Sequence, residues 1–382
     1  MASLNTGLRR FLLVWFLASC PGCNRTPEEE FQRGLTAIEE GQDAVLLDAL
    51  NSLKLHPEYV DHVRLLVGIS RQQSGDHLSA LESFSRVDQD GPLREHLQMN
   101  VGISYHALGR LVEAERVFRP LAKSSPNSPD AHRWLGIVYY DLGAYDFAIA
   151  HLSRLTELEP DDFRPYRLLG LMHRDFERDA DSEAFYRKAL ECTPPKESRR
   201  EIVGELALAY ISQRKYREAL KLVESEPADA ELLAIGSRCL MNLGEKEKAA
   251  SRLKEAARLD PDHRTVLMLQ AEFFQADNRN TEALGRLRRA VKLDHFDIEA
   301  RYKLALLLQK LGSTNEYKVE IAEWEKQKKM KEQLTDLNIK ALSEPFNSEL
   351  RFELADLCEQ LGKKELAVMW RKAGESIRTA AP

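Results

Sequence analysis

The sequence predicts an all-α protein, a superhelical solenoid of about nine or ten antiparallel helix hairpins. The main observation is a period of 34 residues that glycine, proline and alanine all keep, in series that stay in phase with one another. The chain also holds only 19 glycines and 15 prolines among 382 residues, fewer than average usage gives, which favours long helices. The recurring positions are Gly34, Gly68, Gly102, Gly136 and Gly170; Gly41, Gly75, Gly109 and Gly143; Pro92, Pro126, Pro160 and Pro194; and Ala80, Ala114 and Ala148.

Residues 129–162 show why each period predicts one hairpin. Gly143 follows the first apolar stretch, where glycine can end a helix in the left-handed conformation. Ala148 belongs to the inner face of a second helix, and Pro160 ends that helix because proline cannot donate the next helical hydrogen bond. Gly136 and Ala148 are small at the point where the two helices must approach closely.

The residues that carry a family resemblance are Trp134, Leu135, Gly136, Tyr139, Ala148 and Pro160. Their types and spacing resemble the tetratricopeptide repeat. The resemblance extends over nearly all of the chain after residue 27. It implies a solenoid in which the first helix of each repeat lines a concave groove that binds protein partners.

The repeats are expected to follow one another with few interruptions. In 163–196, Glu177 replaces the turn glycine, which predicts a looser turn there. Residues 298–382 form irregular C-terminal units, with a long helix at about 315–342. The other predicted units are a degenerate 28–60, then 61–94, 95–128, 129–162, 163–196, a shortened 200–229, 230–263 and 264–297.

The amino-acid composition excludes several classes of protein. Apolar residues make up 43% of the chain, which excludes a wholly disordered protein. The formal net charge is -6, so bulk electrostatics give no attraction to nucleic acid, and no nucleic-acid partner is expected. Five cysteines are too few for a disulfide scaffold, and Cys192, Cys239 and Cys358 are expected to be buried thiols.

Residues 1–19 have the tripartite build of a secretory signal peptide. Arg9 and Arg10 precede an apolar run at 11–18 that is too short to span a bilayer. Leu17-Ala18-Ser19-Cys20 then resembles the lipobox of bacterial lipoproteins. The resemblance implies that Cys20 is acylated, with palmitate among its lipids, and that residues 20–27 form a flexible tether. An ordinary cleaved signal remains the alternative.

Pro21, which follows the expected lipidated cysteine, favours the outer membrane by resemblance to two-membrane bacteria. The leaflet on which the protein faces stays open.

No catalytic or metal-binding motif stands out in the sequence. The ten histidines are scattered, and no HExxH motif, Cys/His cluster or glycine-rich phosphate loop occurs. Carboxylate pairs such as Asp161-Asp162 fall in the turns between repeats, where aspartate caps helices. We therefore expect no enzyme activity, no cofactor, no metal ion and no small-molecule substrate.

The groove positions implied by the resemblance give a candidate partner-binding site. The site combines guanidinium, aromatic and aliphatic groups, which suit a partner segment with apolar anchors and acidic groups. The alternative is that its arginines pair with Asp141 and Asp175 on adjacent repeats. They would then only keep the wall of the groove hydrated and would bind no partner. The six residues are Arg133, Ile137, Tyr140, Arg167, Leu171 and Arg174.

These features predict a non-catalytic, membrane-anchored scaffold that recruits protein partners at the bacterial cell envelope. Two alternatives stay open. One is a soluble secreted or periplasmic binding module whose signal is removed. The other is an accessory subunit of an enzyme complex, for instance one that handles glycans.

Overall fold

The computed structural model describes residues 25–380, and the described chain is all-α, as the sequence predicts. It contains 20 α-helices and one short 3-10 helix, with no strand among residues 25–380. Contacts divide the described residues into two compact units, which meet between residues 100 and 101. The boundary lies inside α5 (Arg94–Ala107). The predicted signal peptide and Cys20 lie outside the described residues.

The first unit starts at the end of the predicted tether. Pro27 is the first residue of α1, and Thr26 caps that helix through reciprocal hydrogen bonds with Glu29. Phe31 and Phe84 are fully buried and anchor the unit's core. Its elements before α5 are α1 (Pro27–Glu39), α2 (Asp43–Leu53), η1 (Pro57–Tyr59), α3 (Val60–Gln73) and α4 (His77–Phe84).

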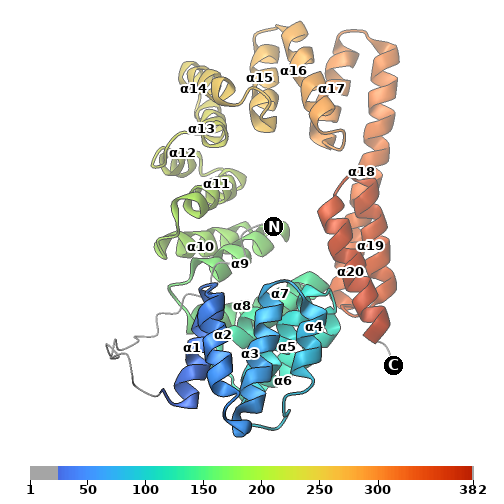
Figure 1. The fold of residues 1–382 in the computed structure, drawn as a ribbon. Helices are drawn as coiled ribbons and strands as arrows, with labels where there is room; N and C mark the ends of the chain where they lie inside the picture. The colour runs from blue at the N-terminus through green and yellow to red at the C-terminus, as the bar shows by residue number, and fades with distance from the viewer. Residues whose placement is uncertain (1–24, 381–382) are drawn as a thin grey trace. The chain divides into compact units, whose positions relative to one another are not determined.

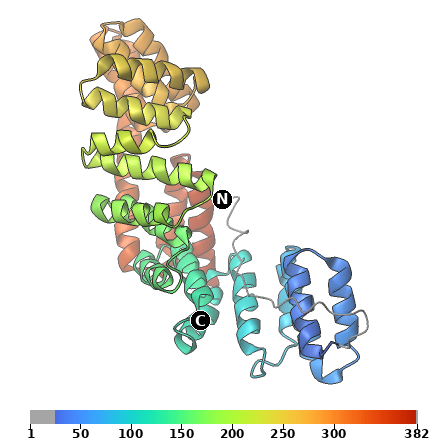
Figure 2. The ribbon, with the colours of Figure 1, turned by 90° about the vertical axis from the view of Figure 1, so that its left-hand side faces the viewer.

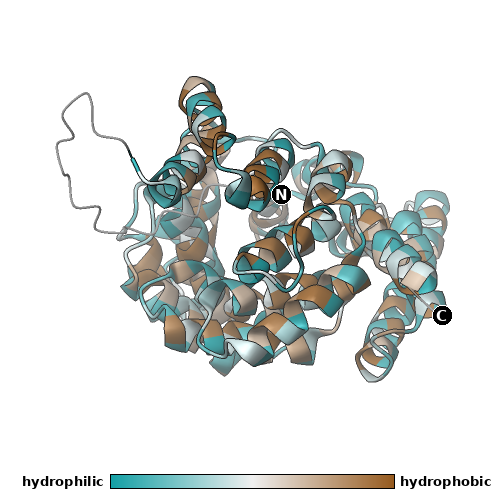
Figure 3. Cartoon of the chain, turned by 60° about the horizontal axis from the view of Figure 1, so that its bottom comes forward, coloured by the Kyte–Doolittle hydropathy of each residue, from teal (hydrophilic) through white to brown (hydrophobic). Residues whose placement is uncertain are grey.

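The second unit is a succession of helix hairpins. Figure 2 shows the hairpins of its middle part stacked one on the next. Hydrophobic and hydrophilic residues alternate along individual helices (Figure 3), so each helix buries one face and exposes the other. The helices after α5 are α6 (Leu111–Ser124), α7 (Pro129–Leu142), α8 (Tyr145–Leu158), α9 (Phe163–Asp175), α10 (Asp179–Glu191), α11 (Lys196–Ser212), α12 (Tyr216–Val223), α13 (Ala230–Asn242), α14 (Lys246–Leu259), α15 (Arg264–Ala276), α16 (Asn280–Leu293), α17 (Ile298–Lys310), α18 (Thr314–Ser343), α19 (Ser348–Gln360) and α20 (Lys364–Ala380).

A glycine opposite a large side chain sets the spacing of the helices within a hairpin. An ideal Cβ on Gly102 would lie 2.5 Å from the ring of Phe118, which is fully buried. Gly170 has the same relation to Tyr186, at 2.7 Å. In both pairs the large residue follows the glycine by 16 positions, as Leu152 follows Gly136 in the hairpin between them, so the period of the sequence reproduces one packing contact in successive hairpins.

The turn at Glu177 corrects one expectation. Glu177 has φ 58°, close to the 70° of Gly143, so the turn keeps the left-handed conformation and is not looser. The reason is the hydrogen bonding that ends the helix. The amides of Glu177 and Arg178 donate to carbonyls of α9 at 2.9 Å, as those of Gly143 and Ala144 do in α7.

The C-terminal part contains one long helix, α18, over the range where the sequence predicts it. Its first half packs on α17, where Trp324 is half-buried and stacks on Tyr302 with ring centroids 4.7 Å apart. The hairpin of α19 and α20 follows, and α20 contacts α6 and α7 (Figure 1). The second unit therefore closes on itself, a feature that the repeat pattern does not predict.

Candidate partner-binding surface

The six residues expected in the groove lie on two helices of neighbouring repeats. Arg133, Ile137 and Tyr140 lie on α7, whereas Arg167, Leu171 and Arg174 lie on α9. We call these six residues the α7–α9 surface. All six are half-buried, and the side chains of the three arginines keep 22%, 25% and 38% of their area exposed. Solvent, or a partner, can therefore reach each guanidinium.

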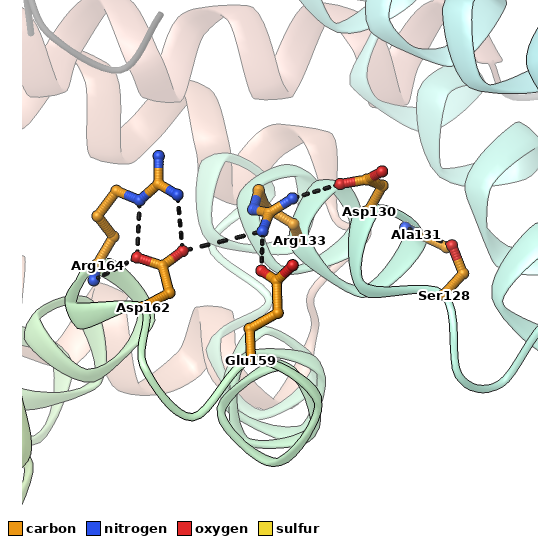
Figure 4. A network of polar contacts seen from close by, with 7 residues as sticks. All are labelled: Ser128, Asp130, Ala131, Arg133, Glu159, Asp162 and Arg164. Carbon is orange, nitrogen blue, oxygen red and sulfur yellow. Dashed lines mark hydrogen bonds and ion pairs between the residues drawn. The ribbon is translucent and has the colours of Figure 1, made fainter. Parts of the chain in front are cut away.

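Arg133 lies at the centre of a charged network between the two repeats (Figure 4). Its guanidinium pairs with Asp130 on α7 and with Glu159 at the end of α8. Asp162 lies 3.9 Å away and also binds Arg164 through two hydrogen bonds of 2.8 Å. Asp162 is at the same time the N-cap of α9, because it accepts the amide of Arg164 at 3.0 Å. The network thus ties the arginine on α7 to the start of α9.

Arg167 repeats this arrangement one hairpin further on. It donates two hydrogen bonds to Glu205 on α11, at 3.1 and 2.7 Å, and pairs with Glu201 at 2.5 Å. Burial raises the pKa of Glu205, and the bond to Arg167 opposes that rise. Arg167 therefore already binds a carboxylate of its own chain through two hydrogen bonds, which is the geometry that a partner's carboxylate would need.

Arg174, the third arginine of the surface, pairs more weakly than the other two. Arg174 contacts Asp175 at 3.3 Å, whereas Asp141 lies 2.7 Å from Nε2 of His106. Burial, and then the charges of Asp175 and Asp141, raise the pKa of Tyr140. The arginines are thus paired within the chain, but mainly by carboxylates other than the two that the sequence suggests.

Three exposed apolar residues lie on first helices outside the α7–α9 surface, on α11 and α17. Leu208, Tyr302 and Leu306 are among the most exposed large hydrophobic residues of the second unit's first helices. They occupy the same fifth and ninth repeat positions as Arg133 and Ile137, in the units that begin at residues 200 and 298. The offsets used for α7 and α9 would have found them if applied to those later units.

A pair of histidines that face each other is not predicted by the sequence analysis. Nδ1 of His132 on α7 lies 3.0 Å from Nδ1 of His151 on α8, and Nε2 of His132 lies 3.1 Å from the carbonyl of Pro126. Burial lowers the pKa of His132, and a neutral His132 that donates to that carbonyl through Nε2 accepts the proton of His151 at Nδ1. Both rings are neutral in this arrangement. The antiparallel pairing of the two helices within a repeat, in which Gly136 faces Leu152, is the feature that would have placed these two histidines on facing helices.

We predict that this pair makes the second unit less stable as the pH falls from about 6.5 to about 4. Burial, and then His132, lower the pKa of His151 from 6.5 to about 4, and burial lowers that of His132. Between these pH values the unfolded chain binds protons that the folded chain does not, so protonation favours unfolding. Urea midpoints at pH 7 and pH 5 measure the loss. It should shrink in His151→Gln, whose amide can still donate to His132, and an unchanged loss in that variant would exclude the pair as its source.

The described part of the chain, residues 25–380, contains neither a candidate metal-ion site nor a candidate membrane-spanning helix. Among residues 25–380, no three or more His, Cys, Asp and Glu side chains gather so as to hold a metal ion. Over the same range, no helix has both the length and the apolar character that crossing a bilayer requires.

Comparison with known proteins is consistent with the repeat architecture. Residues 105–171 and residues 237–298 each match a family model described as tetratricopeptide repeat. No curated protein sequence matches the chain.

Several solved structures are similar at low identity. A tetratricopeptide repeat protein from Parabacteroides merdae is 17% identical, covers 61% of this chain and 93% of its own, and has a TM-score of 0.40. The human IFIT1 dimer with PPP-AAAA is 14% identical, covers 93% and 94%, and has a TM-score of 0.40. YrrB, a protein with an unusual peptide-binding site, is 17% identical, covers 46% and 91%, and has a TM-score of 0.31. The matched repeats and the stacked hairpins together make this chain an all-α solenoid of the tetratricopeptide-repeat type.

Proposed function

We propose that this protein is a non-catalytic scaffold, anchored in the bacterial cell envelope by a lipid on Cys20, whose α7–α9 surface binds a segment of a partner protein. Proteins with tetratricopeptide repeats generally serve protein–protein interactions through the first helices of their repeats. The observation that carries the proposal is the combination on α7 and α9 of aliphatic, aromatic and guanidinium groups that all stay partly exposed.

The apolar members of the surface supply the affinity in this proposal. Ile137 and Leu171 occupy equivalent positions of neighbouring repeats, and Tyr140 lies one turn from Ile137. A partner that covers them removes apolar area from water, at about 25 cal/mol per Å². Tyrosine and arginine are also the residue types most common at binding hot spots.

The arginines supply selectivity. A carboxylate of the partner would have to replace Glu159 on Arg133, or Glu205 on Arg167, in a site that is already paired. Exchange of one carboxylate for another changes the free energy of binding little, because the desolvation of both ions is similar. A partner group without negative charge that displaced the internal carboxylate would leave the guanidinium desolvated and unpaired, which costs binding free energy. We therefore expect the arginines to discriminate against partners that lack an acidic group.

The test is to remove the surface without unfolding the hairpins. A photo-crosslinking residue at Leu171 in living cells identifies the bound protein. Capture of that protein should fall at least tenfold in the variant Arg133→Gln, Tyr140→Ala, Arg167→Gln and Arg174→Gln, while circular dichroism stays helical.

A matched control carries the changes Arg119→Gln, Arg154→Gln and Arg187→Gln. These arginines lie on the second helices α6, α8 and α10 and also form ion pairs within their own helices. Capture by the control should equal that by the wild type. Unaltered capture by the quadruple variant would refute the assignment of the surface.

The anchor has its own test. The lipobox-like Leu17-Ala18-Ser19-Cys20 motif supports acylation of Cys20, and Pro21 favours delivery to the outer membrane. Each buried methylene of an acyl chain contributes about 0.8 kcal/mol to membrane binding. Cys20→Ser should therefore move the protein from the membrane fraction to the soluble fraction, and globomycin should leave the precursor unprocessed. A Cys20→Ser variant that still sediments with membranes would favour another mode of attachment.

A further inference from the structure

The second unit is closed by a contact between residues 264 positions apart. The amide of Val112, in the first turn of α6, donates to Oγ of Ser376 on α20 at 2.8 Å, in a buried position. Arg116 on α6 donates to the carbonyl of Ala380 at 2.8 Å. Arg110, the N-cap of α6, offers no side-chain cap, so Ser376 supplies the capping hydrogen bond from the far end of the unit.

Helix α20 packs on two glycines that lie in the turns between paired helices. A Cβ on Gly143 would lie 2.3 Å from the ring of Trp370, so the indole packs directly on the backbone of the α7–α8 turn. The corresponding turn before α6, at Gly109, faces Lys372, whose side-chain carbons would lie 3.6 to 3.9 Å from a Cβ there. Helix α20 therefore covers the turns of two adjacent repeats.

The hairpin of α19 and α20 is also connected to the rest of the unit by the long helix α18 and by Phe296, whose ring lies 2.3 Å from the position of a Cβ on Gly362 in the α19–α20 turn. The first half of α18 packs on α17, where Glu320 pairs with Arg301. Its second half packs on the hairpin through Leu334 and Ala341. Most of the residues at 325–333 between these two regions are exposed. The middle of α18, which has few buried residues, thus connects the hairpin to the helices before it.

Closure buries a charge that has no counter-ion. Arg351 on α19 is fully buried, and it donates from one terminal nitrogen to the carbonyls of Pro345 and Ala341, at 2.8 and 3.4 Å. Its Nε and other terminal nitrogen have no partner, and no described carboxylate pairs with it. The equivalent residue of the preceding unit, Arg301, also binds a carbonyl six positions back, at 2.8 Å, but pairs with Glu320.

The seat of α20 is what completes the burial of Arg351. The Cβ position of Gly143 lies 3.6 Å from its guanidinium carbon, and the ring of Trp370 covers it at 5.2 Å. Burial lowers the pKa of Arg351 to about 10. If α20 left the α7–α8 turn, water could reach the unpartnered nitrogens. The closed form therefore pays a desolvation cost that the open form does not.

We propose that the α19–α20 hairpin is a releasable clasp, which opens from α6 and α7 while the other hairpins stay folded. Each helix from α6 to α20 contacts the next, and α20 contacts α6, so the closed clasp completes a circuit. Resting on the function proposed above, the clasp controls access to the α7–α9 surface. When the clasp is closed, a partner segment can enter the ring of helices α6 to α20 only through one of the ring's open ends. When the clasp is open, the segment can also enter sideways, between α20 and α6.

An engineered disulfide tests the clasp without any partner. In Gly109→Cys/Lys372→Cys, the Cβ of residue 372 lies 3.9 Å from the Cβ position at 109, within the range of protein disulfides. The amide of Val112 reports the contact, because its acceptor is Ser376. Oxidation should form the 109–372 disulfide, and it should slow exchange of the Val112 amide at least tenfold, while α13 and α14 exchange as before. Peptide mapping separates this bond from the native thiols, and Gly109→Cys alone should show no effect of oxidation.

Three results would overturn the proposal. If the disulfide does not form, α20 does not lie on α6 in solution. If oxidised and reduced forms exchange the Val112 amide equally, or if α13 and α14 slow together with Val112, the contact opens only on global unfolding. The capture experiment on the α7–α9 surface is independent of this one, so either proposal can fail while the other stands.

Discussion

Replacing Trp370 by alanine is expected to release the α19–α20 hairpin from its seat, with a loss of about 3–5 kcal/mol in the free energy that holds it closed. Trp370 is 3% exposed and contacts three groups that its removal would leave unsupported. Its ring packs on the backbone of Gly143, covers the guanidinium of Arg351, and lies 6.4 Å from the ring of Tyr145. Hydrogen exchange of the Val112 amide measures the release.

Val368→Ala is the matched control for this change. Val368 lies on the same helix, two residues before Trp370, but 52% of it is exposed. The control should leave the exchange of Val112 unchanged, because removal of an exposed valine forms no cavity. If the Val112 amide exchanges at the wild-type rate in Trp370→Ala, the indole does not hold α20 on α6, and other contacts keep the hairpin closed.

The repeat pattern predicts the hairpins because their contacts are local. Gly102 meets Phe118 at a separation of 16 residues, and Gly170 meets Tyr186 at the same separation, so a period in the sequence carries the contact with it. The contact of Val112 with Ser376 has no such period. It depends on the summed rotation of all the hairpins between them, to which irregular elements such as α18 contribute. No local pattern at Ser376 distinguishes it from any polar helix residue.

The candidate surface was predictable in part for the same reason. The fifth and ninth offsets of the repeat place Arg133, Ile137, Arg167 and Leu171 on α7 and α9. The partners of the arginines were not predictable from these offsets. Glu205 occupies the sixth position of a shortened unit, and its helix α11 begins at Lys196, before the predicted start at 200. A shift of a few residues in one unit is enough to change which carboxylate meets an arginine of the unit before it.

The second large effect concerns the close approach of helices within a hairpin. Gly102→Ala should destabilise the hairpin of α5 and α6 by about 2 kcal/mol, because overpacking outweighs the better helix propensity of alanine. The new Cβ would lie 2.5 Å from the ring of Phe118. That ring cannot move away easily, since it is fully buried and stacks on Trp134 with an interplanar angle of 9°.

Gly285→Ala is the opposite case on the same kind of helix. Gly285 lies within α16, and nothing lies within 4 Å of the position that its Cβ would take. Alanine should stabilise this helix by about 0.5–1 kcal/mol, since it loses less backbone entropy on folding than glycine does.

Hydrogen exchange of the α6 and α16 amides in these two variants tests most directly whether the recurring glycines exist to let paired helices touch. We predict faster exchange across the middle of α6 in Gly102→Ala and slower exchange across α16 in Gly285→Ala. Slower exchange in both variants would contradict this account, because helix propensity alone would then explain the effect of alanine at the repeat position.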